Sequence, residues 1–279
     1  MAHAAAVSRR QPLAAKVPEV TFLFWVIKLL TTAGGEAVSD YLVPRGYLLT
    51  GVVEVSIFVV AVVLQLSTRR YVAAAYWFLA LAIAIFGTGA ADFMHLIIGI
   101  SYGGTSAFWA FVLAVVFWVW YRAEGTLSIH SIVTRRRELF YWAVVFATFA
   151  LGTALGDFTA RVLHLGYLGS AVLFAVVIMV PAVAWSQLKL NSVLCFWAAY
   201  VVTRPLGASF ADYFGKPKVL SGLAYGEGPV SFVLLAFIVV LVGYTALTRY
   251  DIQRPEMAVA LPDGGSGADE GATDRVTRR

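Results

Sequence analysis

Long apolar runs alternate with short polar breaks along this chain, and that pattern predicts membrane-spanning helices. Each run is long enough to cross a hydrocarbon core about 30 Å thick at about 1.5 Å per residue. The strands of a membrane barrel would be only about ten residues long, with alternating polarity. The sequence therefore predicts an all-α membrane protein with eight transmembrane helices, at Val20–Leu42, Gly46–Leu66, Tyr71–Ile98, Thr105–Trp120, Leu139–Leu163, Leu168–Leu188, Val193–Phe214 and Val230–Leu247.

The first, third, fifth and seventh of these helices share one ungapped pattern. In each, a glycine follows a tryptophan by ten residues and an aspartate follows it by fifteen. The tryptophans are Trp25, Trp77, Trp142 and Trp197, the glycines Gly35, Gly87, Gly152 and Gly207, and the aspartates Asp40, Asp92, Asp157 and Asp212. The pattern predicts four tandem helical-hairpin repeats, related by axes along the membrane normal.

These repeats divide the chain at its polar breaks. We expect repeats at 17–70, 71–137, 138–190 and 191–254. Residues 1–16 would form a cytoplasmic N-terminal tail without a removable signal peptide. Residues 255–279 are rich in Gly, Asp and Glu, and a disordered cytoplasmic tail is expected there.

Composition and charge support a membrane location. The chain is 60% apolar, above the half or so that is usual for soluble domains. Its net charge of +5 does not point to nucleic acid, because most Lys and Arg residues lie in the loops on one side of the predicted helices. The positive-inside rule then predicts a multi-pass membrane protein with both termini in the cytoplasm.

The pattern resembles a bacterial family of multi-pass "membrane-anchored" proteins built from a short repeat of unknown function. The segments that carry the resemblance are KVPEVTFLFWVIKLL, FGTGAADF, LGTALGDF and FWAAYVVTRPLGASFADYFGKP, and it extends over roughly Val17 to Tyr250. The resemblance implies the repeat, the helical architecture and a bacterial inner membrane as the location, and it implies no activity.

Candidate chemistry lies in the repeated aspartates, because a charge inside a membrane is costly, at about 2.5–3.5 kcal/mol on insertion scales. Asp40, Asp92, Asp157 and Asp212 are predicted to bind ions and protons at one shared polar centre. Glu36, one turn before Asp40, would assist. Two other interpretations stay open: each aspartate fixes a neighbouring repeat through hydrogen bonds, or marks a wet helix end.

Other residues have two possible roles each. Arg204, with Pro205 beside it, either neutralises a carboxylate or attracts an anionic substrate. Glu54 is a sixth candidate carboxylate, and His95 is either a proton relay or a packed side chain. The repeated glycines, Gly35, Gly87, Gly152 and Gly207, either allow close helix packing or break their helices locally.

The motifs that would indicate other activities are missing. The chain has no GxxxxGK[ST], HExxH or GxSxG pattern and no zinc-ligand spacing. No enzyme activity and no cofactor are therefore expected, although intramembrane carboxylates can also be catalytic. The sequence predicts a secondary transporter of a small inorganic cation, coupled to protons. The alternatives are a passive cation channel, an organic-anion carrier centred on Arg204, and a non-transport membrane protein; oligomeric state stays open.

Overall fold

A computed structural model describes residues 15–253 and shows eight long helices in this part of the chain, without a strand. Each is long and apolar enough to cross a membrane, as the sequence predicts. The helices are α1 (Phe22–Leu42), α2 (Tyr47–Ser67), α3 (Ala73–Asp92), α4 (Tyr102–Glu124), α5 (Arg135–Asp157), α6 (Gly166–Ser186), α7 (Ser192–Gly215) and α8 (Glu227–Thr248). Short helical turns follow α1, α3 and α5, at Val43–Arg45, Phe93–Ile97 and Phe158–Val162.

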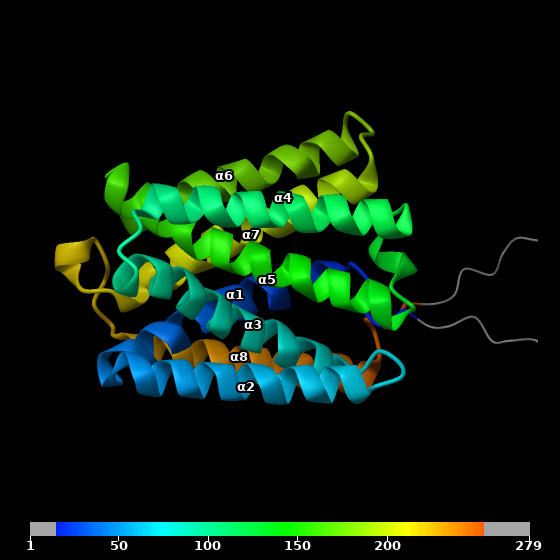
Figure 1. Cartoon of the computed structure of the whole chain (residues 1–279), viewed down its shortest axis with the longest axis horizontal. Helices are drawn as coiled ribbons and strands as arrows, with labels where there is room; N and C mark the ends of the chain where they lie inside the picture. The colour runs from blue at the N-terminus through cyan, green and yellow to red at the C-terminus, as the bar shows by residue number, and fades with distance from the viewer. Residues whose placement is uncertain (1–14, 254–279) are drawn as a thin grey trace, which may run out of the picture.

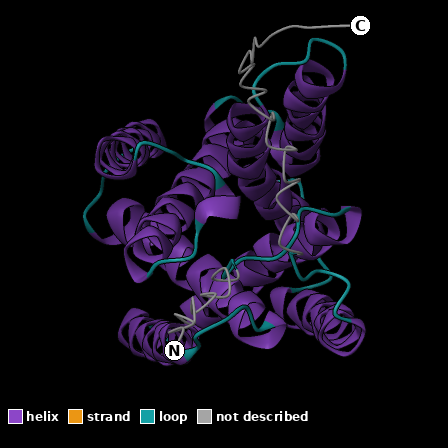
Figure 2. Cartoon of the chain, turned by 90° about the vertical axis from the view of Figure 1, so that its right-hand side faces the viewer, coloured by secondary structure: helices purple, strands orange, loops and turns teal. Residues whose placement is uncertain are grey.

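The odd-numbered helices form an inner ring and the even-numbered helices surround it (Figure 1). In the ring, α1 packs on α3, α3 on α5, α5 on α7 and α7 on α1. Half or more of each inner helix is buried, 50–72%, against 17–28% for the outer helices. Seen along the bundle, the outer helices stand apart around inner helices that cross at an incline (Figure 2).

Each outer helix packs mainly on the inner helix of the next repeat. Thus α2 lies on α3, α4 on α5 and α6 on α7, and α8 closes the circle against α1. The two helices of one repeat contact each other much less. The two helices of each predicted hairpin are therefore joined by a loop, but the closest packing is between the outer helix of one repeat and the inner helix of the next.

The repeated glycines allow these close approaches between inner helices. Each lies within an α-helix, so the alternative of a local helix break is wrong. A Cβ added at any of them would overlap the next inner helix. The residues met are Ala84 for Gly35, Phe149 for Gly87, Arg204 for Gly152 and Thr32 for Gly207. All four of these contact residues occupy one repeat position, seven residues after the tryptophan.

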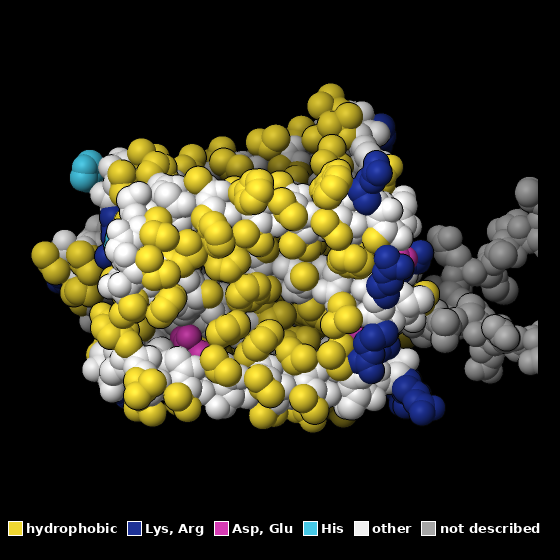
Figure 3. Space-filling model, in the orientation of Figure 1, with side chains coloured by type: hydrophobic (Ala, Val, Ile, Leu, Met, Phe, Trp, Pro, Cys, Tyr) yellow, Lys and Arg dark blue, Asp and Glu magenta, His cyan; other side chains and the backbone are white. Residues whose placement is uncertain are grey.

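The two ends of the bundle differ in charge. At the end that we name the terminal end, the two ends of the described chain meet, since the Glu19 N–H donates to the Asp251 carbonyl at 2.8 Å. Lys and Arg side chains gather there, while apolar side chains cover most of the rest of this face (Figure 3). The opposite end, the distal end, holds the connections around residues 43–46, 98–101, 163–165 and 216–226.

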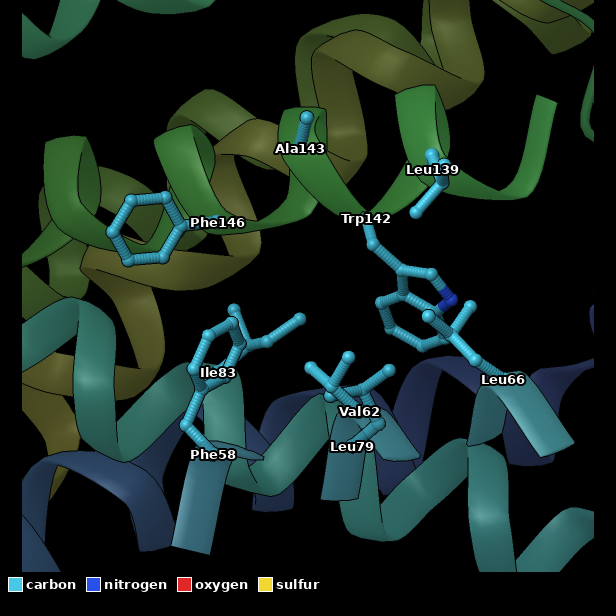
Figure 4. Close-up of a pocket in the computed structure, with 9 residues that line it drawn as sticks. All are labelled: Phe58, Val62, Leu66, Leu79, Ile83, Leu139, Trp142, Ala143 and Phe146. Atoms are coloured by element: carbon cyan, nitrogen blue, oxygen red, sulfur yellow. The ribbon is translucent and has the colours of Figure 1, made fainter. Parts of the chain in front are cut away.

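A lateral groove of about 220 Å³ lies between α2, α3 and α5 (Figure 4). Its walls are apolar side chains, apart from the indole nitrogen of Trp142. They are Phe58, Val62, Leu66, Leu79, Ile83, Leu139, Trp142, Ala143 and Phe146. The groove therefore lies apart from the acidic residues that the sequence singles out.

Candidate functional site: an axial column with an acidic distal end

Five positions of each inner helix supply a column of side chains in the centre of the ring. They lie one residue before the repeated tryptophan and three, seven, eleven and fifteen residues after it. Steps of four residues keep them on one inclined ridge of each helix. From the terminal to the distal end, the layers are Phe24, Tyr76, Tyr141 and Phe196; Lys28, Ala80, Val145 and Tyr200; Thr32, Ala84, Phe149 and Arg204; Glu36, Thr88, Thr153 and Ala208; and the four aspartates.

Aromatic side chains fill the terminal half of the column. The hydroxyl groups of Tyr76 and Tyr141 share a hydrogen bond. The ammonium group of Lys28 lies 3.8 Å from the ring centre of Phe149 and 4.0 Å from that of Tyr200. Its nitrogen is buried without a hydrogen-bond partner among the described residues, so the two ring faces are its polar contacts. The packed rings close this half of the column.

In the middle of the column, Arg204 joins three repeats. Its Nη2 donates to the Glu36 carboxylate at 2.5 Å, to Thr153 Oγ1 at 2.7 Å, and also to Thr88 Oγ1. Its Nη1 donates to the Thr32 carbonyl at 3.3 Å. The Arg204 side chain is fully buried and the Glu36 side chain is 4% exposed, so the two charges compensate each other away from water.

At the distal end, the structure brings two of the four repeated aspartates together around a lysine. Carboxylate oxygens of Glu36, Asp40 and Asp212 lie within 4.8 Å of one another. The Lys216 ammonium lies 2.6 Å from Asp40 Oδ2, 3.7 Å from Asp212 Oδ1 and 3.9 Å from Glu227 Oε1. Burial alone would lower the pKa of Lys216, but the charges of Asp40 and Asp212 outweigh it and raise the pKa well above its ordinary value.

The other two repeated aspartates have different surroundings. Asp157 pairs with Arg161 at 3.0 Å, and the Tyr167 hydroxyl donates to the same carboxylate oxygen at 3.4 Å. Asp92 has no ion pair or side-chain hydrogen bond to other residues within 15–253. The four aspartates thus hold one repeat position and differ in their partners.

Helices α3 and α5 end at their repeated aspartates, and each continues as a π-helical turn. Repeat 1 continues as a 3₁₀ turn, Val43–Arg45, and α7 continues as an α-helix to Gly215. Wider π turns occur often at functional sites, because they change the direction of the side chains that follow. The backbone beyond the aspartate is therefore alike in repeats 2 and 3 and different in repeats 1 and 4.

The remaining candidates lie beside the column. Glu54 of α2 accepts a hydrogen bond from Ser39 at 2.6 Å, and Gly89 leaves space for its carboxylate. His95 bonds the Ile100 carbonyl through Nδ1 at 2.8 Å and stacks on Tyr102. These contacts hold His95 in the distal connection.

The acidic distal part of the column holds more negative than positive groups. Among residues 15–253, seven buried or half-buried carboxylates lie between the Arg204 layer and the distal end: Glu36, Asp40, Glu54, Asp92, Asp157, Asp212 and Glu227. The Lys and Arg side chains of the same burial there are Arg161, Arg204 and Lys216. The excess must be neutralised by protons or by bound cations, because unpaired buried charge is costly.

Sequence reasoning missed Lys216 and Glu227 as members of this group. A signal for the lysine exists, since repeats 3 and 4 both place a basic residue four positions after the aspartate, Arg161 and Lys216. Glu227 begins α8 and reaches the cluster because α8 closes the circle against α1. No local sequence pattern predicts that α8 packs against α1.

The fold and the column define a polytopic helical membrane protein in which four tandem units surround an axis that is aromatic at the terminal end and acidic at the distal end. A family model described as a Repeat of Unknown Function (DUF347) matches residues 23–71, 75–126, 140–190 and 195–250. Each match begins two residues before a repeated tryptophan, and together they include most of the chain. The chain belongs to this family, as its sequence pattern predicts. No curated protein and no solved structure matches it.

Proposed function

We propose that this protein is a secondary transporter of a small inorganic cation, coupled to protons. The observation that carries the proposal is the excess of carboxylates over basic groups at the distal end of the axial column. Such a group holds either protons or a cation, and exchanging one for the other couples their movements. Oxygen donors favour hard cations such as Ca²⁺, Mg²⁺ or Mn²⁺ over soft metals.

The proposed orientation follows from charge. Within residues 15–253 the terminal end carries most of the exposed Lys and Arg residues, so the positive-inside rule assigns it to the cytoplasm, together with both chain termini. In this orientation the carboxylates lie toward the outer face of a bacterial inner membrane. The aromatic layers stand between them and the cytoplasm, so transport requires these rings to separate in a second conformation.

Two alternatives are less well supported by these contacts. An organic-anion carrier needs free donors on Arg204, but both of its Nη groups already bind protein oxygens, including the Glu36 carboxylate, and among residues 15–253 only its buried Nε lacks a partner. A passive channel needs a continuous polar path, and the aromatic layers around Tyr76, Tyr141 and Phe149 interrupt it. Alternating access, in which the two ends open in turn, fits a column that is closed at one end.

The test is cation uptake by purified protein in proteoliposomes, screened over alkali metals, Ca²⁺, Mg²⁺ and Mn²⁺ with and without an inside-acid pH gradient. We expect uptake of at least one cation, stimulated by the gradient, and lost in Asp212→Asn and Asp92→Asn. Glu19→Gln, an acidic residue at the terminal end, is the control and should retain uptake. Uptake indifferent to the gradient would identify a channel. Absence of flux with all cations would refute transport.

A further inference from the structure

The Lys216 ammonium occupies the space between carboxylates where a metal ion would find its ligands. Its neighbours come from three helices: Asp40 from α1, Asp212 from α7 and Glu227 from α8. Glu36, one turn below Asp40, adds a carboxylate oxygen within 4.8 Å of the two aspartates. An ion held by four carboxylates from these elements would have the oxygen-rich surroundings that hard divalent cations require.

The lysine satisfies this site incompletely. Asp212 is 3% exposed, and its Oδ1 is a buried oxygen without a hydrogen-bond partner among the described residues. The Lys216 nitrogen faces it at 3.7 Å, which is too far for a hydrogen bond. Both Glu227 carboxylate oxygens likewise lack a hydrogen-bond partner within residues 15–253. A metal ion with several ligands at about 2.0–2.6 Å would draw in oxygens that one ammonium group leaves unbonded.

The backbone of Lys216 is fixed, whereas its side chain is a flexible stem. Its N–H donates to the Asp212 carbonyl at 2.9 Å, and its carbonyl accepts from Ala224 at 2.9 Å. A Cβ at Gly222 would overlap this carbonyl, so the loop is shaped around the lysine. The side chain is 17% exposed, so the site is reached from the distal end and the ammonium can leave toward water.

We propose that Lys216 is a tethered cation, which occupies the site formed by Glu36, Asp40, Asp212 and Glu227 and is displaced when a divalent metal ion binds there. This inference rests on the proposed function and names its binding site and the group that competes for it. The lysine offsets part of the carboxylate charge while no ion is bound. The site then holds a positive charge in both the empty and the loaded state, which reduces the charge difference between them.

The first test measures Mn²⁺ binding, by electron paramagnetic resonance, to purified wild-type protein, Lys216→Met and Lys218→Met. Removing the competing charge, which lies 2.6–3.9 Å from three of the carboxylates, should tighten Mn²⁺ binding by at least about tenfold in Lys216→Met. Lys218, two residues away and exposed, is the matched control, and its variant should bind as the wild type does. Equal or weaker binding in Lys216→Met would overturn the proposal.

The second test needs no variant. Amine acylation, read by mass spectrometry, should modify Lys216 slowly in metal-free protein and several-fold faster with saturating Mn²⁺, while Lys218 stays constant. Mn²⁺ binding without a change at Lys216 would overturn the inference even if Lys216→Met fails to fold. Cation uptake by the wild type together with either negative result refutes the tethered lysine alone. Absence of both uptake and Mn²⁺ binding refutes the proposed function as well.

Discussion

Arg161 and Lys216 hold the same position in successive repeats, four residues after the repeated aspartate, yet they bind in different ways. Arg161 forms an ion pair with Asp157 of its own repeat and donates to the Tyr167 hydroxyl at 2.9 Å. Lys216 lies closer to Asp40 of another repeat than to its own Asp212. One basic residue thus fixes an acid locally, and the other joins acids from separate helices.

The difference follows from side-chain chemistry and from the backbone beyond each aspartate. A guanidinium group is a planar fork that holds a carboxylate and a hydroxyl in fixed geometry, whereas an ammonium group is a compact point charge on a flexible stem. Arg161 lies in a π turn, while Lys216 immediately follows the α-helix. A repeated position can therefore supply a fixed structural charge in one unit and a movable charge in the next.

The largest expected effect is a difference in Mn²⁺ binding between variants of Asp212 and Asp157. Asp212→Asn should weaken Mn²⁺ binding by at least about tenfold, since it replaces a charged ligand with a neutral amide. Asp157→Asn should leave it within about threefold, because Arg161 already occupies that carboxylate. Equilibrium binding of Mn²⁺ to both purified variants measures this. Equal losses would place Asp157 in the same site and remove the distinction.

Arg161 should contribute to the stability of the protein, whereas Lys216 should affect metal binding. Arg161→Met leaves the Asp157 carboxylate, 11% exposed, without its ion-pair partner. We expect a loss of about 2 kcal/mol in the free energy of unfolding, below the full cost of breaking a buried pair because Arg161 is partly exposed. Unfolding in detergent measures the loss, with Arg161→Lys as the charge-preserving control. An unchanged stability would show that the pair contributes little.

Exchanging the two basic side chains gives a smaller effect. Lys216→Arg places a fork that can bind two carboxylate oxygens at once, so it should be harder to displace and should weaken Mn²⁺ binding by about threefold to tenfold. Arg161→Lys should leave Mn²⁺ affinity unchanged. The same titration measures both. Tighter binding in Lys216→Arg would contradict displacement of the residue at 216 by the ion.

The smallest effect concerns alkaline pH. Because the folded-state pKa of Lys216 is raised, its stabilising charge is fully present below the unfolded-state pKa and is lost only as pH rises through the folded value. In metal-free protein, acylation of Lys216 should therefore stay slow up to about pH 10, near the ordinary pKa of lysine. Exposed Lys218 provides the reference rate. A parallel rise at both lysines would show that the carboxylates do not hold the charge.

The helices and the repeat were predictable because a membrane helix satisfies its own backbone hydrogen bonds, so length and apolarity suffice to find it. The ungapped spacing of tryptophan, glycine and aspartate then marks the inner helices. The layer of Glu36, Thr88 and Thr153 was also present in that spacing, one residue after each glycine, but its members differ in type and gave no visible motif.

The partners of the acids could not be read from the sequence. Asp40 meets Lys216 across 176 positions because α1 and α7 are neighbours in the closed ring, and Arg204 reaches Glu36 across 168. Repeat spacing alone treats the four aspartates as equivalent. Their differences arise from side chains that lie outside the repeated pattern, and the ring geometry decides which of those side chains reach the axis.

Helix α8 packs against α1 in the same way as each of the other outer helices packs on the inner helix of the next repeat. The order of the four units is therefore circular in space, although it is linear in the gene. The two described ends lie side by side, at Glu19 and Asp251. A gene rearranged to join these ends and to begin at another inter-unit loop, such as that around Asn191, should encode the same bundle. The point where translation starts is thus independent of the architecture that it produces.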